Sequence, residues 1–140
     1  MTLVVDASVA LKWFVAEPGS QAAVSLLSAG EALVAPDLIV AELTNAAWRS
    51  WRRGELLAEQ ARAIPPRLGI LIQRLHSCAA LAPRATEIAL ELEHPAYDCF
   101  YLALAERHRT VVVTADRRLV TKLDGTPFAE LARALTASVT

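Results

Sequence analysis

The stretch Val111-Val112-Val113-Thr114-Ala115-Asp116 joins an apolar, mostly β-branched run to an acid at its end. A continuous apolar run of this kind is typical of a strand buried on both faces of a parallel sheet. Near the amino terminus, Leu3-Val4-Val5 is followed in the same way by Asp6. Ligand sites in open parallel sheets lie beyond the carboxyl ends of the strands. We therefore expect Asp6 and Asp116 to face one crevice if their strands are neighbours.

Short apolar runs alternate with helical patterns along the rest of the chain. Strands are predicted at residues 3–5, 32–35, 78–81 and 111–114. Helices are predicted at residues 8–15, 21–29, 36–53, 55–75 (bent or broken at Pro65-Pro66), 83–93, 96–107, 116–123 and 128–135. This alternation implies parallel strands joined by right-handed crossovers. We predict one α/β domain over residues 1–140, a three-layer α/β/α sandwich with a four- or five-stranded, mainly parallel sheet.

Composition narrows the class of protein. The chain has 140 residues, 54% of them hydrophobic, and a net charge of −1 from 14 basic and 15 acidic residues. Bulk charge therefore gives no nucleic-acid signal, and any basic patch must be local. Cys78 and Cys99 lie far apart in apolar runs, which favours reduced core residues. The sequence has neither a signal-peptide pattern nor an uninterrupted apolar stretch of membrane-spanning length, so we expect a cytoplasmic protein.

Two further acids lie in apolar surroundings. Glu42 falls inside Leu38-Ile39-Val40-Ala41-Glu42-Leu43, and Asp98 precedes Cys99-Phe100-Tyr101-Leu102-Ala103-Leu104-Ala105. A buried carboxylate is costly unless it is paired or coordinates a metal, and none of the four acids has an obvious basic partner on its own element. If the fold brings these acids together, a divalent cation is the natural counter-charge.

Simpler interpretations remain open for each acid. Asp6, Asp98 and Asp116 can serve as helix caps or complement a helix dipole. Glu42 can be an exposed helix residue or a partner of Arg49, because the two share a helix face.

Four segments, taken in order, resemble the motifs of PIN-domain nucleases. They are Val4-Val5-Asp6-Ala7-Ser8, Pro36-Asp37-Leu38-Ile39-Val40-Ala41-Glu42-Leu43, Tyr97-Asp98-Cys99-Phe100-Tyr101-Leu102-Ala103-Leu104-Ala105 and Val113-Thr114-Ala115-Asp116-Arg117-Arg118-Leu119. The resemblance covers about residues 2–124 and is strongest to VapC-type toxins of type II toxin–antitoxin pairs. It implies a ribonuclease that depends on Mg²⁺ or Mn²⁺, with Asp6, Glu42, Asp98 and Asp116 as the catalytic and metal-binding acids.

The same resemblance assigns supporting residues and partners. Ser8 and Thr114 match positions that hydrogen-bond a carboxylate or water, and helix spacing adds Asn45 beside Glu42. Independently of the resemblance, Lys12, Arg117, Arg118 and Lys122 lie on elements that follow the acidic strand ends, which makes them candidates for RNA binding, because phosphate contacts carry most of the affinity for nucleic acid. The alternative is that they are solvated helix charges. A cognate antitoxin and a homodimer are implied as well. Trp13, Trp48 and Trp51 all fall in the first 51 residues, which suits either core packing or a partner-binding groove.

The chemistry that we expect is hydrolysis of an RNA phosphodiester by metal-activated water, which leaves 5′-phosphate and 3′-hydroxyl ends. His76, His94 and His108 lie in three separate contexts, so no histidine is placed for attack by the RNA 2′-hydroxyl. The alternatives are a PIN-like module that has lost catalysis and only binds RNA or a partner, and a receiver-type phosphoacceptor. The receiver class needs a lysine after a late strand, where this chain has Asp116.

Overall fold

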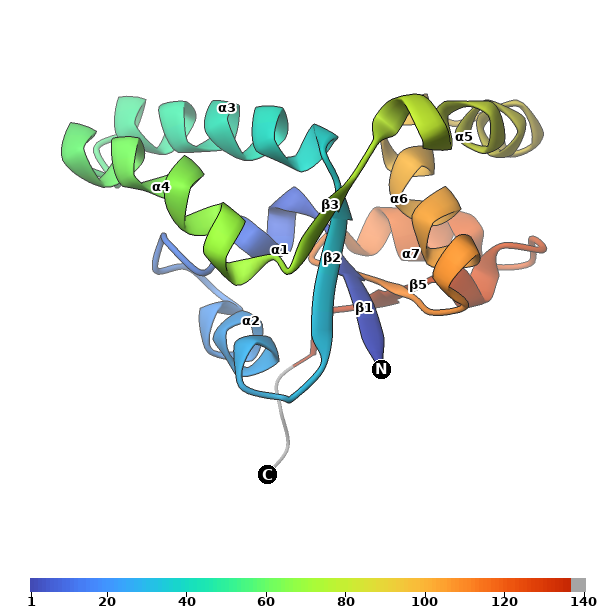
Figure 1. Cartoon of the computed structure of the whole chain (residues 1–140), viewed down its shortest axis with the longest axis horizontal. Helices are drawn as coiled ribbons and strands as arrows, with labels where there is room; N and C mark the ends of the chain where they lie inside the picture. The colour runs from blue at the N-terminus through green and yellow to red at the C-terminus, as the bar shows by residue number, and fades with distance from the viewer. Residues whose placement is uncertain (137–140) are drawn as a thin grey trace.

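Five parallel strands form the central sheet of the computed structural model, which describes residues 1–136 (Figure 1). The strands are β1 (Thr2–Val5), β2 (Ala32–Pro36), β3 (Arg74–His76), β4 (Val112–Thr114) and β5 (Ala132–Ala134). Their order across the sheet is β3-β2-β1-β4-β5. The predicted α/β sandwich with a parallel sheet is confirmed, and the last four residues of the predicted domain, 137–140, lie outside the described part.

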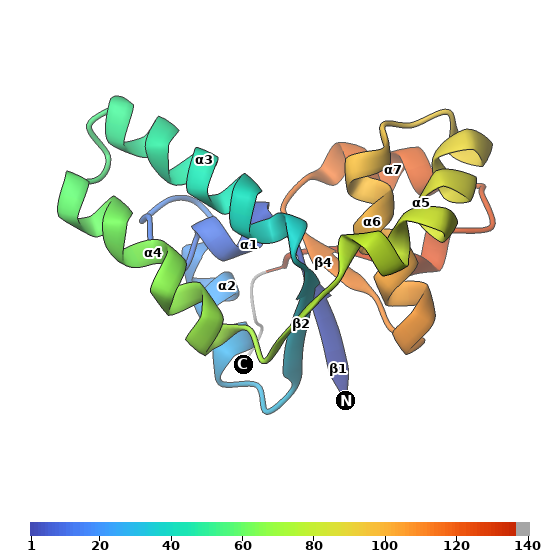
Figure 2. The same cartoon turned by 45° about the horizontal axis from the view of Figure 1, so that its top comes forward.

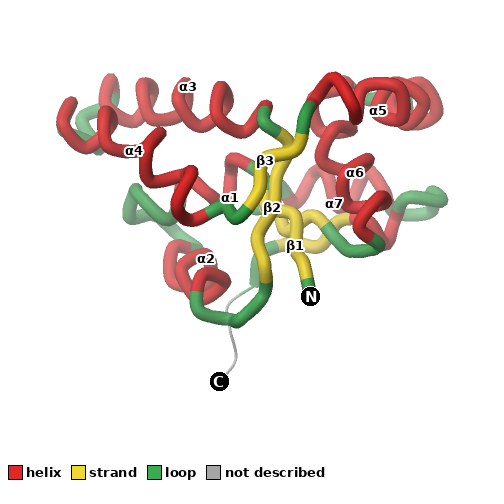
Figure 3. Tube along the Cα trace, viewed as in Figure 1, coloured by secondary structure: helices red, strands yellow, loops and turns green. Residues whose placement is uncertain are grey.

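Helices cover both faces of the sheet, as Figures 1 and 2 show. On one side lie α1 (Ala7–Leu11), α2 (Ser20–Leu27), α3 (Leu38–Arg52) and α4 (Ala58–Leu71). On the other lie α5 (Cys78–Leu92), α6 (Ala96–His108) and α7 (Arg117–Leu123). The chain moves from β1 out to β3 and then returns to β4 and β5. Because both excursions use right-handed crossovers, they place their helices on opposite faces; Figure 3 shows the sheet between the two sets.

The two strands that carry the acids are neighbours at the centre of the sheet. β1 pairs in parallel with β4, with Val4 opposite Val112 and Val5 opposite Val113. All four of these valines are at most 1% exposed. Burial of all four side chains follows from the helices that cover both faces of the sheet. Because β1 and β4 pair in parallel, the two strands end side by side at the same edge.

The predicted strand at residues 78–81 is wrong. The strand lies earlier, at Arg74–His76, and α5 begins at Cys78. Ser77 separates the strand from the helix. Its hydroxyl accepts a hydrogen bond from the Ala80 N–H (3.4 Å) and thereby caps the amino terminus of α5. The helix then continues through Pro83 in its second turn. Cys78 is consequently a half-buried helix residue, whereas Cys99 is buried as expected.

The helix predicted at residues 55–75 is shorter and unbroken. It runs from Ala58 to Leu71 and passes through Pro65 and Pro66. Both prolines are exposed, while Ile64 and Leu68 pack into the core on the opposite side of the helix. Core contacts on that side outweigh the missing N–H groups of the prolines. Two other boundaries also moved: α1 ends at Leu11 rather than at residue 15, and Pro36 ends β2 instead of opening α3.

The helix predicted at residues 128–135 is also wrong. A short 3-10 turn, Ala129–Leu131, leads into β5, an edge strand that pairs in parallel with β4. The Leu135 N–H donates to the Thr114 carbonyl at 2.8 Å, and Phe128 and Ala132 are buried. Pairing with β4 thus satisfies backbone groups that a helix would have satisfied internally.

Candidate active site

Asp6 is the most buried of the four acids. It caps α1: its carboxylate accepts hydrogen bonds from the Ser8 hydroxyl (2.5 Å) and the Val9 N–H (3.2 Å). Burial raises the pKa of this carboxyl above its ordinary value of 3.8, and the negative charge of Asp98 raises it further. Hydrogen bonds from Ser8, Thr114 and Val9 act against that rise. The site thus holds a desolvated carboxylate in a position where a second acid opposes its ionisation.

Ser8 and Thr114 link the two strand ends. The Ser8 hydroxyl, which donates to Asp6, also accepts from the Ala115 N–H at 3.0 Å. Thr114 is fully buried, and its hydroxyl accepts from the Asp116 N–H at 3.0 Å. These contacts hold the segment after β4 against the segment after β1. Ser8 and Thr114 are the two hydroxyl residues for which the resemblance to PIN-domain nucleases implied such hydrogen bonds.

Glu42 reaches the same region from α3. Its carboxylate accepts a 2.5 Å hydrogen bond from the Tyr101 hydroxyl. Burial raises the pKa of Glu42, and the charges of Asp6 and Asp98 add to that rise. Glu42 and Arg49 form no ion pair within residues 1–136, so the structure does not support the interpretation that they are partners. In the sequence Tyr101 is only one member of the apolar run after Asp98, so its role as the donor to Glu42 was missed.

Asp98, in the first turn of α6, is the third member of this acidic cluster. Its charge raises the pKa of both Asp6 and Glu42. A ring nitrogen of His94 lies 2.7 Å from its carboxylate. Sequence analysis gave His94 no place at the site. The spacing of four residues to Asp98 was the signal available for this contact.

Asp116 lies at the rim of the cluster. It caps α7, and its carboxylate accepts from the Arg118 N–H at 3.0 Å. Its side chain is 45% exposed, and its carboxylate lies 3.8 Å from the Arg118 guanidinium. Asp6 and Asp116 are therefore both helix caps. The capping interpretation and the interpretation as site residues hold together for these two aspartates.

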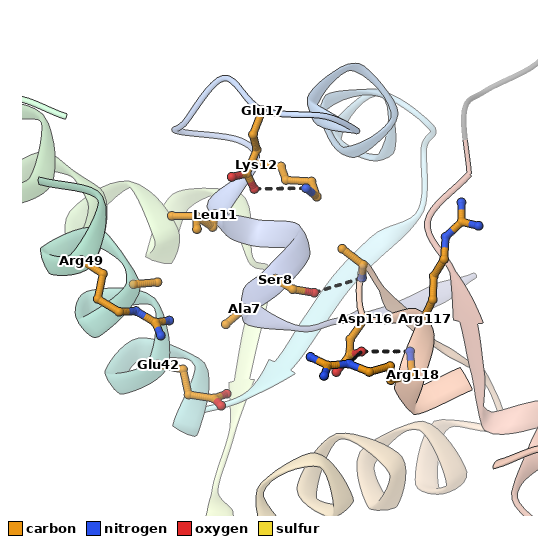
Figure 4. Close-up of a pocket in the computed structure, with 12 residues that line it drawn as sticks. Ala7, Ser8, Leu11, Lys12, Glu17, Glu42, Arg49, Asp116, Arg117 and Arg118 are labelled. Carbon is orange, nitrogen blue, oxygen red and sulfur yellow. Dashed lines mark hydrogen bonds and ion pairs between the residues drawn. The ribbon is translucent and has the colours of Figure 1, made fainter. Parts of the chain in front are cut away.

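A cleft of about 640 Å³ lies beside the cluster (Figure 4). Glu42 and Asp116 line it from opposite walls. Basic side chains around it are Lys12, Arg49, Arg117 and Arg118. Lys12 is already engaged, because its ammonium binds Glu17 (3.1 Å) and the Pro18 carbonyl (2.7 Å).

Two predicted residues lie away from this cleft. Lys122 does not line it, and its ammonium lies 3.4 Å from the Glu93 carbonyl. Asn45 is exposed on α3 and is not among the lining residues either. Arg49, which does line the cleft, was considered only as a partner of Glu42.

The donor set suits a hard divalent cation. Carboxylates are the oxygen ligands that Mg²⁺ prefers, and this ion is held by one or two of them while it keeps several waters. Neither Asp6 nor Glu42 pairs with a basic side chain in the part of the chain that the structure describes. Within that part, no group of three or more His, Cys, Asp or Glu side chains is arranged to hold a metal ion. Two carboxylates completed by water therefore fit this conformation better than a closed protein cage.

The comparisons with known proteins agree with this geometry. The family model described as the PIN domain matches residues 3–124. The chain belongs to the PIN-domain family. A curated relative, Ribonuclease VapC3 of Pyrobaculum aerophilum, is 35% identical over 124 residues, which cover 87% of this chain and 95% of the relative. This likeness places the chain among PIN-domain proteins of the VapC type.

Solved structures share the PIN fold. The crystal structure of PAE2754 from Pyrobaculum aerophilum superposes with a TM-score of 0.67 at 25% identity, covering 90% of this chain and 82% of that one. VapBC2 from Rickettsia felis, solved bound to a DNA fragment from its promoter, gives 0.69 at 13% identity, with 97% and 100% covered. Residues 1–136 contain no helix that is long and apolar enough to cross a bilayer.

Proposed function

We propose that this PIN-domain protein is a metal-dependent endoribonuclease that acts as the toxin of a toxin–antitoxin pair. One observation carries the proposal: burial and neighbouring negative charge raise the pKa of both Asp6 and Glu42, with Asp98 acting on both carboxyls and Asp6 acting on Glu42. Such a site is unfavourable unless a cation or a proton compensates it. The match to Ribonuclease VapC3 supports RNA as the substrate.

The residues take distinct roles in this proposal. Asp6 and Asp98 hold the ion, and Glu42 and Asp116 face the cleft, where they can accept hydrogen bonds from water. A bound Mg²⁺ or Mn²⁺ supplies charge stabilisation at the phosphate and activates water. Ser8 and Thr114 keep the Asp6 carboxylate in place, and Tyr101 does the same for Glu42.

The positive charge for substrate binding comes from the cleft walls. Arg117 and Arg118 begin α7 beside Asp116, and the Arg118 side chain is 98% exposed. Single-stranded nucleic acid is held by grooves with such charge along the backbone. An activity of this kind would act in the cytoplasm, where its RNA substrate is found.

A groove whose walls combine apolar side chains with Glu59, Gln60 and Arg67 is our candidate for the antitoxin-binding site. It has a volume of about 380 Å³ and lies between the residues after α1 and the helix α4, with Trp13, Phe14, Leu56 and Ile64 in its walls. For the homodimer, the candidate surface is the outer face of α3, where Val40, Trp48 and Trp51 are exposed. Light scattering of the isolated chain should give the mass of a dimer, and a monomer mass would exclude this surface. Co-purification with the product of the neighbouring reading frame tests the antitoxin.

The activity itself is tested with purified protein, a mixed-sequence RNA and Mg²⁺. We expect cleavage that EDTA abolishes, and a loss of about 100-fold or more in Asp98→Asn, because that substitution removes a charge from the ion site. Asp124→Asn, an exposed acid outside the cleft, is the matched control and should retain full activity. Cleavage that persists in EDTA, or full activity in Asp98→Asn, would reject the proposal in favour of a different chemistry. Metal-independent RNA binding without cleavage would favour the inactive module instead.

A further inference from the structure

Arg49 lies on the same face of α3 as Glu42. The two residues are seven positions apart, and Ala46 between them also lines the cleft. Figure 4 shows the Arg49 side chain extending from α3 toward the cleft on the side of Glu42. Seven residues correspond to about 10 Å along a helix axis, or about three nucleotides of a stacked strand. Arg49 is thus placed to reach a phosphate up to about three nucleotides along the strand from the one over the acids.

Arg49 is also free to bind an anion. It is exposed, and it makes no ion pair within residues 1–136. Two other cations that line the cleft are already close to a carboxylate: Lys12 binds Glu17 at 3.1 Å, and Arg118 lies 3.8 Å from Asp116. Among the cations of the α3 wall, Arg49 alone lines the cleft.

If Arg49 had a purely structural role, its substitution should have the same effect as substitution of Arg52. Both lie in the last turn of α3, where a positive charge complements the helix dipole. Both are exposed. They differ in direction, because only Arg49 lines the cleft. Comparing substitutions of Arg49 and Arg52 therefore distinguishes an effect of positive charge on the helix from an effect on binding in the cleft.

We propose that Arg49 is a substrate-binding residue, which holds a backbone phosphate of single-stranded RNA on the α3 side of the acidic cluster. Arg117 and Arg118 stand on the α7 side, so the RNA strand crosses the cleft between the two walls, over Glu42 and Asp116. The negative cluster repels the strand at its middle, and cations on both sides offset that repulsion. This inference rests on the proposed function for the identity of the ligand, single-stranded RNA, but it does not require that the protein cleaves RNA.

Binding is measured by fluorescence anisotropy with a fluorescein-labelled, single-stranded RNA 12-mer of mixed sequence, in EDTA, over a series of salt concentrations. Each phosphate contact to a single strand contributes about 0.7 to the slope of log K against log salt. We expect Arg49→Gln to lower the magnitude of this slope by about 0.7 and to raise Kd about five- to tenfold at low salt. Arg49→Lys should retain most of the slope, and Arg52→Gln should match the wild type.

Two outcomes overturn the inference: a slope in Arg49→Gln equal to that of the wild type, or equal losses in Arg49→Gln and Arg52→Gln. Thermal unfolding of each variant confirms that the comparison is between folded proteins. Because no cleavage is needed, the test is independent of the proposed activity. A chain that binds RNA through Arg49 but never cleaves it keeps this inference and loses the proposed function. A chain that cleaves RNA with an unchanged slope in Arg49→Gln does the reverse.

Discussion

At the scale of single residues, Asp6 combines a local and a long-range role. Its carboxylate caps α1, and it is also held, buried, near two other acids. The cap would be satisfied equally well by a neutral oxygen acceptor. On balance the negative charge is unfavourable in the metal-free fold, because burial and the charge of Asp98 outweigh the hydrogen bonds that favour it, and such a net cost is typical of a functional residue.

Replacing Asp6 with Asn should stabilise the metal-free protein at neutral pH. The pKa of Asp6 in the folded protein lies above 3.8, so the folded state holds this proton more firmly than the unfolded chain. The resulting stability is fully present below 3.8 and is lost as the pH rises through the raised pKa. Asparagine never pays this electrostatic cost and can still accept the Ser8 and Val9 hydrogen bonds.

The measurement is thermal unfolding in EDTA. We expect Asp6→Asn to unfold a few degrees above the wild type at pH 7.5, since 1 kcal/mol moves the Tm of a domain of this size by about 4 °C. The difference should vanish near pH 3.5. Asp124→Asn, at an exposed position, should show no difference at either pH. A lower Tm for Asp6→Asn at pH 7.5 would contradict the account of a strained acidic cluster.

The sequence allowed the four acids to be identified, but not their surroundings. Each acid stands next to an apolar run, which is a local signal. Tyr101 and Glu42 are 59 positions apart in the chain, and their contact exists only because α6 and α3 approach each other at the carboxyl edge of the sheet. The position of Arg49 at the cleft could not be predicted either, because the other walls of the cleft come from α1 and α7.

At the scale of elements, well-buried segments were predicted correctly and edge segments were not. β1 and β4 are almost fully buried, so their sequences are continuous apolar runs. β3 and β5 are three-residue strands at the two edges of the sheet, each partly exposed. Sequences such as Arg74-Leu75-His76 and Ala132-Arg133-Ala134 carry no strand signal of their own. Pairing with the central strands determines their structure.

Helix ends offer a test at this same scale. Gly54 follows α3 with φ of +79°, and two hydrogen bonds close the helix there: Gly54 N–H to the Trp51 carbonyl and Glu55 N–H to the Ser50 carbonyl, both 2.9 Å. Gly69 lies inside α4 without a positive φ. A Cβ atom would meet nothing within 4 Å at either position. The two glycines therefore differ in backbone conformation alone.

Chemical denaturation of Gly54→Ala and Gly69→Ala measures that difference. Gly54→Ala should lower the free energy of unfolding by about 1 kcal/mol, because alanine is strained in the left-handed conformation. Gly69→Ala should raise it by up to about 1 kcal/mol, because alanine favours the helix. Equal effects of the two substitutions would show that the end of α3 is not defined by Gly54.

At the scale of the whole molecule, the strand order explains why distant acids meet. β1 and β4 are neighbours, α3 follows β2, and α6 packs across β1, β2 and β4. All four acids are thereby delivered to the carboxyl edge of one parallel sheet. The net charge of −1 conceals this arrangement, because the acids gather in the cluster while the arginines of α3 and α7 line the cleft beside it.

The central claim is that this cluster directs hydrolysis of RNA by water rather than attack by the RNA 2′-hydroxyl. Attack by water at phosphorus breaks the bond to the 3′-oxygen, which leaves with a proton. Mass spectrometry of an RNA 12-mer digested in Mg²⁺ identifies the ends directly, with Asp98→Asn as the background control. The account predicts 5′-phosphate and 3′-hydroxyl ends; a 2′,3′-cyclic phosphate with a 5′-hydroxyl would contradict it.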